Sequence, residues 1–252
     1  MYLAEAVDLK RGEMTALIGA GGKTTAMFRL AKEMRDQGCK LLVTTTTKIF
    51  KPTKPHVDRL FLIEDIDGFA NASAQIHPPV TVGAGYGVNE EGKLLGLPVA
   101  WLDRLNERSA YDAILIEADG AASRLFKIPS ENEPVIPSSC RLTIWLMAIK
   151  ILGKSLDPES VHRAERVADL LGGTPSPLVT EELVLNLVKH PAGSLKGIPS
   201  SSRKVALINQ ADSETEIEAA RSLGKKFLGC GLDRVVVSSF TSDDPVKEVL
   251  IQ

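Results

Sequence analysis

The sequence is poor in cysteine and in long apolar runs. Its 252 residues include three cysteines, Cys39, Cys140 and Cys230, which lie far apart and form no C-x-x-C pair. That pattern argues against a disulfide framework and against a structural zinc site. The most apolar run, Leu142–Leu152, also contains Lys150 and is far shorter than the ~20 residues that span a bilayer. The sequence therefore predicts no transmembrane helix and no membrane partner.

Basic and acidic residues are nearly equal in number. Lys plus Arg number 30 and Asp plus Glu number 32, which gives a net charge of −2. A dedicated nucleic-acid binder carries a larger imbalance, so no nucleic-acid partner is predicted. The first residues, MYLAEAVDLKRGE, lack the basic start and apolar stretch of a secretory signal. We therefore expect a cytoplasmic protein, and a homodimer is left open as its assembly.

Short apolar runs alternate with helical patterns along the chain. Several runs are apolar on both faces of a strand, as in a sheet that is covered on both sides. Met27, Leu30, Ala31 and Met34 follow the spacing of one helix face. This alternation predicts an α/β fold of three layers, α/β/α, around a mostly parallel sheet. The predicted strands are 14–18, 40–43, 59–63, 113–116, 142–146, 205–208 and 234–237.

No long linker divides the chain, so residues 1–252 are predicted to form a single domain with two embellishments. Residues 80–98 contain five glycines and a polar N-E-E-G centre, which favours a β-hairpin excursion from the sheet. Residues 153–203 carry two expected short helices, 158–171 and 180–189, between Gly/Pro-rich turns. We interpret this second segment as a small helical insertion.

The segment GAGGKTT follows the first apolar run and precedes the first helical stripe. This strand, loop and helix order is the context that a phosphate-binding loop requires. The glycines would let backbone N–H groups turn towards an anion at the helix N-terminus. Lys23 would neutralise the terminal phosphates, Thr24 would reach Mg²⁺, and Thr25 would contact the α-phosphate. The candidate nucleotide-binding residues of the loop are Gly19, Gly21, Gly22, Lys23, Thr24 and Thr25.

The loop departs from the pattern G-x-x-x-x-G-K-[ST], because Leu17 stands where the first glycine belongs. Its shorter form, G-x-x-G-K-T-T, resembles the loop of Mur-type amide ligases and the wider SIMIBI class of P-loop NTPases. That resemblance implies that residues 1–252 form a P-loop NTPase-like domain. A plain glycine-rich turn with a surface lysine is the alternative. We expect Lys23 to be exposed, so that its removal costs binding far more than stability.

A second candidate element is the apolar strand that ends in Glu117 and Asp119. Open parallel sheets place their ligand chemistry at such strand ends. Together with Thr24, these two carboxylates are candidate Mg²⁺ ligands, and with Lys23 they are candidate catalytic residues. The E-x-x-G pattern of residues 117–120 is similar to that of metallochaperone GTPases. The alternative is an ordinary acidic strand end before a turn.

A third element is the run LINQAD, which resembles the N-K-x-D motif that binds guanine in GTPases. In that comparison Asn209 braces the base site and Asp212 accepts hydrogen bonds from the base, but Gln210 replaces the lysine. The alternative is structural, since Ser213 and Glu216 form a capping-box pattern for the following helix. Asn209 and Asp212 are therefore candidate nucleotide-binding residues, and GTP and ATP both stay open.

In this order the elements resemble the YqeC family, the selenium-dependent hydroxylase accessory proteins, over nearly the whole chain. The resemblance implies Mg²⁺-dependent binding of GTP or ATP in maturation of a selenium-dependent molybdenum hydroxylase. Its implied partners are that hydroxylase or the proteins that assemble its molybdenum cofactor. The segments that carry the resemblance are 19–25, 44–49, 117–137, 161–172, 190–199 and 207–212.

Three hypotheses for function follow. The first is a slow Mg²⁺-dependent NTPase that acts in this maturation. The second is a P-loop kinase or ligase that transfers phosphate to a small cofactor-like acceptor, with the helical insertion closing over it. The third is a nucleotide-gated scaffold without turnover, because no sequence motif identifies a base for the attacking water.

Two further segments keep alternatives open. Thr44–Thr47 and Lys48 either offer hydroxyls and a cation to the phosphate site or are merely suited to a strand. Glu117–Pro137 is either a switch that responds to nucleotide or a rigid, proline-braced connection. Within it, Arg124 and Lys127 either meet a phosphate or are solvated. No metal is assigned to the isolated histidines His56, His77, His162 and His190.

Overall fold

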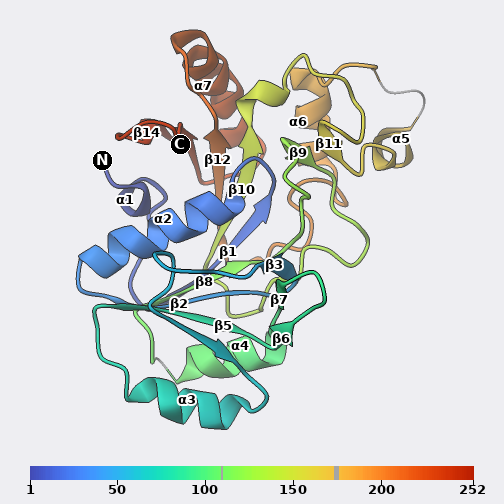
Figure 1. Cartoon of the computed structure of the whole chain (residues 1–252). Helices are drawn as coiled ribbons and strands as arrows, with labels where there is room; N and C mark the ends of the chain where they lie inside the picture. The colour runs from blue at the N-terminus through green and yellow to red at the C-terminus, as the bar shows by residue number, and fades with distance from the viewer. Residues whose placement is uncertain (109, 173–175) are drawn as a thin grey trace.

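The centre of the protein is a nine-stranded sheet (Figure 1). A computed structural model of the chain describes residues 1–108, 110–172 and 176–252. The strand order is β14-β13-β12-β10-β1-β8-β2-β5-β4, and every described pair is parallel except β13 with β14. The strands are β1 (Glu13–Gly19), β2 (Lys40–Thr45), β4 (Arg59–Leu62), β5 (Val80–Gly85), β8 (Ala113–Glu117), β10 (Leu142–Ala148), β12 (Arg203–Asn209), β13 (Arg234–Ser238) and β14 (Val246–Ile251).

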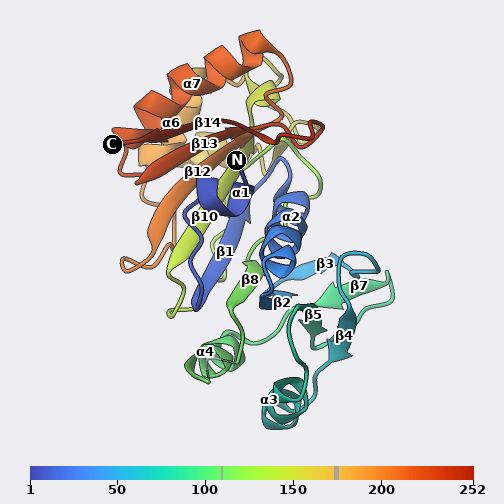
Figure 2. The ribbon, with the colours of Figure 1, turned by 90° about the vertical axis from the view of Figure 1, so that its left-hand side faces the viewer.

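Helices cover both faces of this sheet, as Figure 2 shows for α2 on one side and α7 on the other. The apolar side chains form two clusters, one on each face of the sheet. The predicted three-layer α/β/α arrangement is therefore confirmed. One face carries α1 (Leu3–Ala6) and α2 (Lys23–Asp36), and the other carries α3 (Ile66–Ala74), α4 (Val99–Glu107), α6 (Glu181–Lys189) and α7 (Glu214–Leu228).

The central strands are apolar throughout because both of their faces are covered. In β1, Ala16 and Ile18 pack into the cluster of α3, α4, α6 and α7, whereas Leu17 between them packs into the cluster of α1 and α2. Side chains alternate between the faces of a strand, so each face of this strand needs its own apolar residues. This requirement explains the continuous apolar runs that predicted the strands.

The hairpin predicted for residues 80–98 is wrong at its start. Val80–Gly85 is β5, which lies inside the main sheet between β2 and β4. The antiparallel pair begins later, with β6 (Gly87–Val88) and β7 (Lys93–Leu95), and β3 (Lys48–Phe50) joins it as a third strand. Packing explains why β5 contains Gly85, because a Cβ at this position would lie 2.4 Å from Leu94 Cδ1.

The helix predicted for residues 158–171 is also shorter than expected. Only Arg166–Leu171 is helical (α5), and Val161–His162 is a short strand, β11, that pairs in parallel with β9 (Phe126–Lys127). The second predicted helix, 180–189, is confirmed as α6 (Glu181–Lys189) and is capped by Thr180. Between them, residues 173–175 lie outside the described residues. A single-turn 3₁₀ helix, η1 (Ile149–Ile151), follows β10.

No helix in the described ranges combines the length and the apolar character needed to cross a membrane.

Candidate functional site

The candidate residues meet at the carboxyl edge of the sheet, where β1, β8 and β12 end. β1 lies directly beside β8, with Leu17 in register with Glu117. On its other side β1 pairs with β10, which pairs with β12 so that Ala148 faces Asn209. Parallel sheets commonly bind ligands at this edge.

The loop after β1 lies tightly against the end of β10, and two glycines make this possible. Gly19 has φ +91°, and a Cβ at this position would lie 2.2 Å from Leu146 O. Gly21 has φ +79°, and its Cβ would lie 2.5 Å from Ala148 N. Both positions therefore combine a left-handed backbone with a close approach that excludes other residues.

The N–H groups of the loop divide into two sets. The N–H group of Gly19 donates to Asp119 Oδ2 (2.9 Å), and that of Gly21 donates to Arg124 O (3.0 Å). The sequence predicts that these two N–H groups point to a phosphate, and that prediction is wrong. The next N–H groups, at residues 22–25, begin α2, whose N-cap Gly22 supplies no capping side chain and whose first turn has no acidic residue. By contrast, Ser213 caps α7 and Thr180 caps α6. The start of α2 thus keeps donors that no side chain among the described residues caps.

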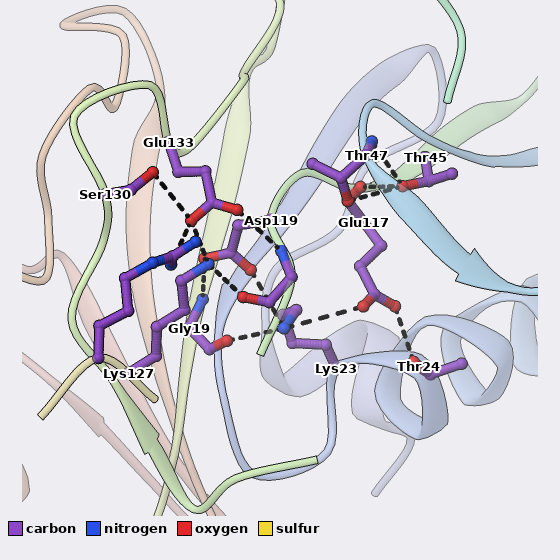
Figure 3. A network of polar contacts seen from close by, with 12 residues as sticks. Gly19, Lys23, Thr24, Thr45, Thr47, Glu117, Asp119, Lys127, Ser130 and Glu133 are labelled. Atoms are coloured by element: carbon purple, nitrogen blue, oxygen red, sulfur yellow. Dashed lines mark hydrogen bonds and ion pairs between the residues drawn. The ribbon is translucent and has the colours of Figure 1, made fainter. Parts of the chain in front are cut away.

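Lys23 is buried, which corrects the expectation of an exposed lysine. Its side chain is 4% exposed, and Nζ donates to Gly19 O at 2.7 Å (Figure 3). The same Nζ lies 3.1 Å from Asp119 Oδ1 and 3.8 Å from Glu117 Oε1. Lys23 therefore neutralises two buried carboxylates and contributes to folding as well as to the loop.

Thr24 and Glu117 place two possible metal-ligand oxygens side by side at the wall of the cavity. Thr24 Oγ1 donates to Glu117 Oε2 at 2.7 Å. Burial raises the pKa of Glu117, against the opposing effect of the Lys23 charge. A hydroxyl beside a carboxylate suits Mg²⁺, which binds proteins through few carboxylates and completes its shell with phosphates and water. Within the described part of the chain no group of three or more His, Cys, Asp or Glu side chains is placed to hold a metal by itself.

Asp119 belongs to a buried charge cluster rather than to the open site. Its Oδ2 lies 3.1 Å from Lys127 Nζ, which also lies 2.9 Å from Glu133 Oε2 and donates to Gly120 O. Arg163 reaches the same Glu133 oxygen at 2.6 Å. Since Lys23 and Lys127 both contact Asp119, this carboxylate is less available to a metal than Glu117 is.

A cavity of about 740 Å³ opens beside the loop. Its far walls come from β3, from residues 120–124 and from Arg163. Ligand pockets usually have volumes of ~300–1,000 Å³, so this cavity has room for a nucleotide. Among the predicted site residues, Gly21, Gly22, Lys23, Thr24, Thr25 and Glu117 line it, whereas Gly19, Asp119, Asn209 and Asp212 do not.

The comparisons with known proteins can now be set beside this geometry. A family model described as "YqeC protein" matches residues 15–165. The chain belongs to the YqeC family. A curated protein of Escherichia coli (strain K12), "Uncharacterized protein YqeC", is 35% identical over 201 residues, which cover 80% of this chain and 77% of that protein. The range matched by the YqeC model contains the loop, Glu117 and the charge cluster, while Asn209 and Asp212 lie beyond it.

In this YqeC-family chain, Asn209 is a brace for the loop. It is buried, its Nδ2 donates to Gly21 O at 2.8 Å, and its Oδ1 accepts from Ser238 Oγ at 3.1 Å. Asp212 accepts hydrogen bonds from Ser239 at the end of β13 and from Lys150 of η1 (2.5 Å each). These contacts lower the pKa of Asp212, the hydrogen bond from Lys150 most.

The capping box of α7 is confirmed at Ser213 and Glu216. The N-cap residue of α7 is Ser213 and not Asp212. The capping box therefore does not exclude a contact between Asp212 and a base.

The threonines at the end of β2 and directly after it mostly donate to backbone carbonyls. Thr44 donates to Ala84 O at 2.8 Å, Thr45 to Glu117 O at 2.7 Å and Thr46 to Val135 O at 2.7 Å. Of the two interpretations of these threonines, the structural one therefore accounts for these three hydroxyls. Lys48, in contrast, lines the cavity.

Glu117–Pro137 is anchored over most of its length. Lys127 is buried instead of solvated, and Lys196 of the helical insertion donates to Ser130 O at 2.9 Å. Residues 120–124 differ, because they line the cavity, and Ala122 and Ser123 have φ of +47° and +59°. The contacts favour the rigid interpretation for residues 125–137. Residues 120–124 are also held at both ends, by Lys127 at Gly120 O and by Gly21 N–H at Arg124 O, and a response of these residues to nucleotide stays a prediction.

The charge cluster gives a testable pH dependence. Burial alone would raise the pKa of Glu133, but the hydrogen bonds and charges of Lys127 and Arg163 outweigh it and lower the pKa from 4.5 to about 2. A folded-state pKa below the unfolded value stabilises the fold above pH 4.5, and this contribution is lost as the pH falls from 4.5 to about 2. By about pH 3 the loss amounts to roughly 2 kcal/mol.

Urea unfolding of the wild type and of Glu133→Gln, at about pH 6 and about pH 3, measures this loss. The wild type should lose ~2 kcal/mol more than Glu133→Gln over that interval. Glu117 titrates in the opposite sense, because its raised pKa favours the folded state at low pH, but it does so in both proteins. Equal losses would show that Glu133 does not contribute.

Proposed function

We propose that this YqeC-family protein binds a nucleoside triphosphate with Mg²⁺ at the loop of residues 21–25 and hydrolyses it slowly. The resemblance of its motifs to the selenium-dependent hydroxylase accessory proteins extends the proposal to a role in maturation of a molybdenum hydroxylase. The phosphates would lie in the 740 Å³ cavity, beside Lys23 and Thr24.

The uncapped start of α2 carries this proposal. A helix N-terminus presents unpaired N–H donors and positive potential, which together favour an anion. Here the 14-residue helix α2 begins at the wall of the cavity without a capping side chain. The buried ammonium of Lys23 lies in the same turn, where Asp119 and Glu117 hold it beside the cavity. A triphosphate supplies the anionic oxygens that this arrangement lacks.

Thr24 Oγ1 and one oxygen of Glu117 would hold Mg²⁺, since they are 2.7 Å apart and both line the cavity. When bound there, Mg²⁺ would offset negative charge on the phosphate oxygens. Lys23 would orient the terminal phosphate, and Asp119 would hold the ammonium of Lys23 in place from behind, at 3.1 Å. The role of this chain would then be positioning and charge neutralisation, which dominate catalysis of phosphoryl transfer.

The base would lie near the ends of β12 and β13. Gln210 of the N-Q-x-D segment lines the cavity, and the carboxylate of Asp212 lies nearby, bonded to Ser239. Lys150 would supply the positive charge that Gln210 lacks, because its ammonium already contacts Asp212. The choice of guanine rests on the resemblance of this segment to the N-K-x-D motif. Because Ser239 and Lys150 already bond the two oxygens of Asp212, a guanine would have to replace or share one of these contacts.

The base assignment is tested by Asp212→Asn. If the carboxylate accepts hydrogen bonds from guanine, its replacement by an amide should reduce the preference for GTP over ATP by about tenfold or more, because hydrogen bonds to charged groups contribute ~1.5–3 kcal/mol. Ser213→Ala is a matched control, because it removes the cap of α7 and leaves the carboxylate in place. Titration of each protein with both nucleotides measures the ratio. An unchanged ratio in Asp212→Asn would assign Asp212 to structure alone.

Product analysis tests the reaction. Incubation with Mg²⁺ and γ-labelled GTP or ATP should release inorganic phosphate slowly, and Lys23→Ala should abolish the release. A labelled acceptor in place of free phosphate would favour a kinase or ligase. Tight binding without turnover, even with a client hydroxylase present, would favour the nucleotide-gated scaffold.

A further inference from the structure

A second cavity of about 590 Å³ adjoins the first one. It lies where β2 and β5 end and where β7 of the small three-stranded sheet passes them. Lys48, Gly120 and Glu133 line both cavities, so the two spaces meet at these residues. Nothing in the proposed nucleotide site uses this second space.

The walls of the second cavity are suited to a flat ring. Tyr86 is 53% exposed, and its ring lies beside that of Trp101, with 6.0 Å between the ring centroids. Leu95 adds an apolar side chain. Gly96 and Thr46 also line the cavity, and their backbones lie so close that a Cβ on Gly96 would come within 2.3 Å of Thr46 C. An exposed aromatic face beside such a backbone wall favours stacking of a planar molecule.

The charges around this cavity favour one anionic group on that molecule. Lys48 is exposed and forms no salt bridge with any described residue. The carboxylate of Glu133 is neutralised by Lys127 and Arg163, at 2.9 and 2.6 Å, so it does not oppose an anion. The exposed ammonium of Lys48, whose charge also acts on Glu91, therefore offers an anion a contact where the two cavities meet.

We propose that the second cavity binds a second substrate at the same time as the nucleotide, and that this substrate is a small planar ring compound with one anionic group. Its ring would stack on Tyr86 and its anion would meet Lys48, next to the phosphates. The role of this compound as a co-substrate rests on the proposed nucleotide site. Binding of the compound in the second cavity does not depend on that site.

Two probes test the site, 2-naphthoate and 2-naphthyl phosphate, which share the ring and differ in the anion. Ligand-observed NMR should detect saturable binding of at least one of them, and Mg²⁺ with a non-hydrolysable triphosphate should not displace it. The stronger of the two identifies a carboxylate or a phosphate as the preferred anion. Tyr86→Ala and Lys48→Met should each weaken binding by about 3- to 10-fold.

Tyr2→Ala is the matched control, since Tyr2 is 55% exposed and lines neither cavity. Lys23→Ala separates the two sites, because it should lose the nucleotide and keep the probe. Absence of saturable binding by both probes, displacement by nucleotide, or equal binding by Tyr86→Ala would each overturn the second site. These three results would leave the nucleotide site standing if the triphosphate still binds.

Discussion

Replacement of Lys23 by Ala is expected to weaken triphosphate binding by about 10- to 150-fold. A charge-assisted contact to phosphate contributes ~1.5–3 kcal/mol, and each 1.4 kcal/mol corresponds to a factor of ten. Calorimetric titration with non-hydrolysable analogues of GTP and ATP, in the presence of Mg²⁺, measures the change. If the variant binds the analogues as tightly as the wild type does, the loop of residues 21–25 is not the triphosphate site.

The burial of Lys23 shapes the design of that experiment. Its ammonium pairs with Asp119 at 3.1 Å, so Lys23→Ala also lowers the free energy of unfolding. Unfolding without nucleotide is therefore measured first, and the titration is done at a temperature where the variant is folded. Lys32→Ala is the matched control, because Lys32 lies on the same helix, is 67% exposed and forms a surface ion pair with Asp36. That control should bind nucleotide like the wild type.

The second large effect is expected at Lys127. Its side chain is 1% exposed and lies between Asp119 and Glu133, at 3.1 and 2.9 Å. Removal of one partner from a buried ion pair costs ~3–5 kcal/mol, because it leaves an uncompensated buried charge. Lys127→Met, which keeps much of the side-chain volume, should therefore lower the free energy of unfolding by about that amount in urea.

The combination of Lys127→Met with Glu133→Gln tests the cause of this loss. If the cost comes from an unpaired carboxylate, the double variant should lose less than the sum of the two single variants. The matched control is again at Lys32, since its surface pair with Asp36 is expected to contribute little. A loss in Lys127→Met no larger than in Lys32→Met would mean that the cluster is not coupled to folding.

The glycine-rich loop between β1 and α2 and the main strands could be predicted because their signals are local. The glycines and Lys23 occupy consecutive positions between a strand and a helix, and the apolar runs of β1 and β8 are continuous. The burial of Lys23 could not be predicted in this way. Its partners Glu117 and Asp119 are almost a hundred residues away, and only the β1 and β8 pairing brings them together.

The charge cluster was missed for the same reason. Lys127, Glu133 and Arg163 come from a two-residue strand, from the connection after it and from the turn after β11. Lys127 resembles any loop cation in the sequence, but the pairing of Val161–His162 with Phe126–Lys127 draws Arg163 to the same carboxylate. A charged residue next to short strands with no apolar periodicity gives no signal for such pairing.

The glycines of residues 80–98 misled the prediction in the opposite direction. Five glycines favour turns, so the whole segment was expected to leave the sheet. In β5, however, Gly83 and Gly85 are needed because Leu60 and Leu94 pack directly over them, with Cβ positions that would lie 3.0 and 2.4 Å from these side chains. Glycine here marks a close approach between elements, and only the tertiary contact distinguishes that from a turn.

The most direct test of the nucleotide site is a structure determined with Mg²⁺ and a non-hydrolysable triphosphate. We expect the β- and γ-phosphates to accept hydrogen bonds from the N–H groups of residues 22–25, with Lys23 on the terminal phosphate and Thr24 on the metal. Phosphates bound elsewhere on the protein, or no nucleotide bound at millimolar concentration, would contradict the site proposed at the start of α2.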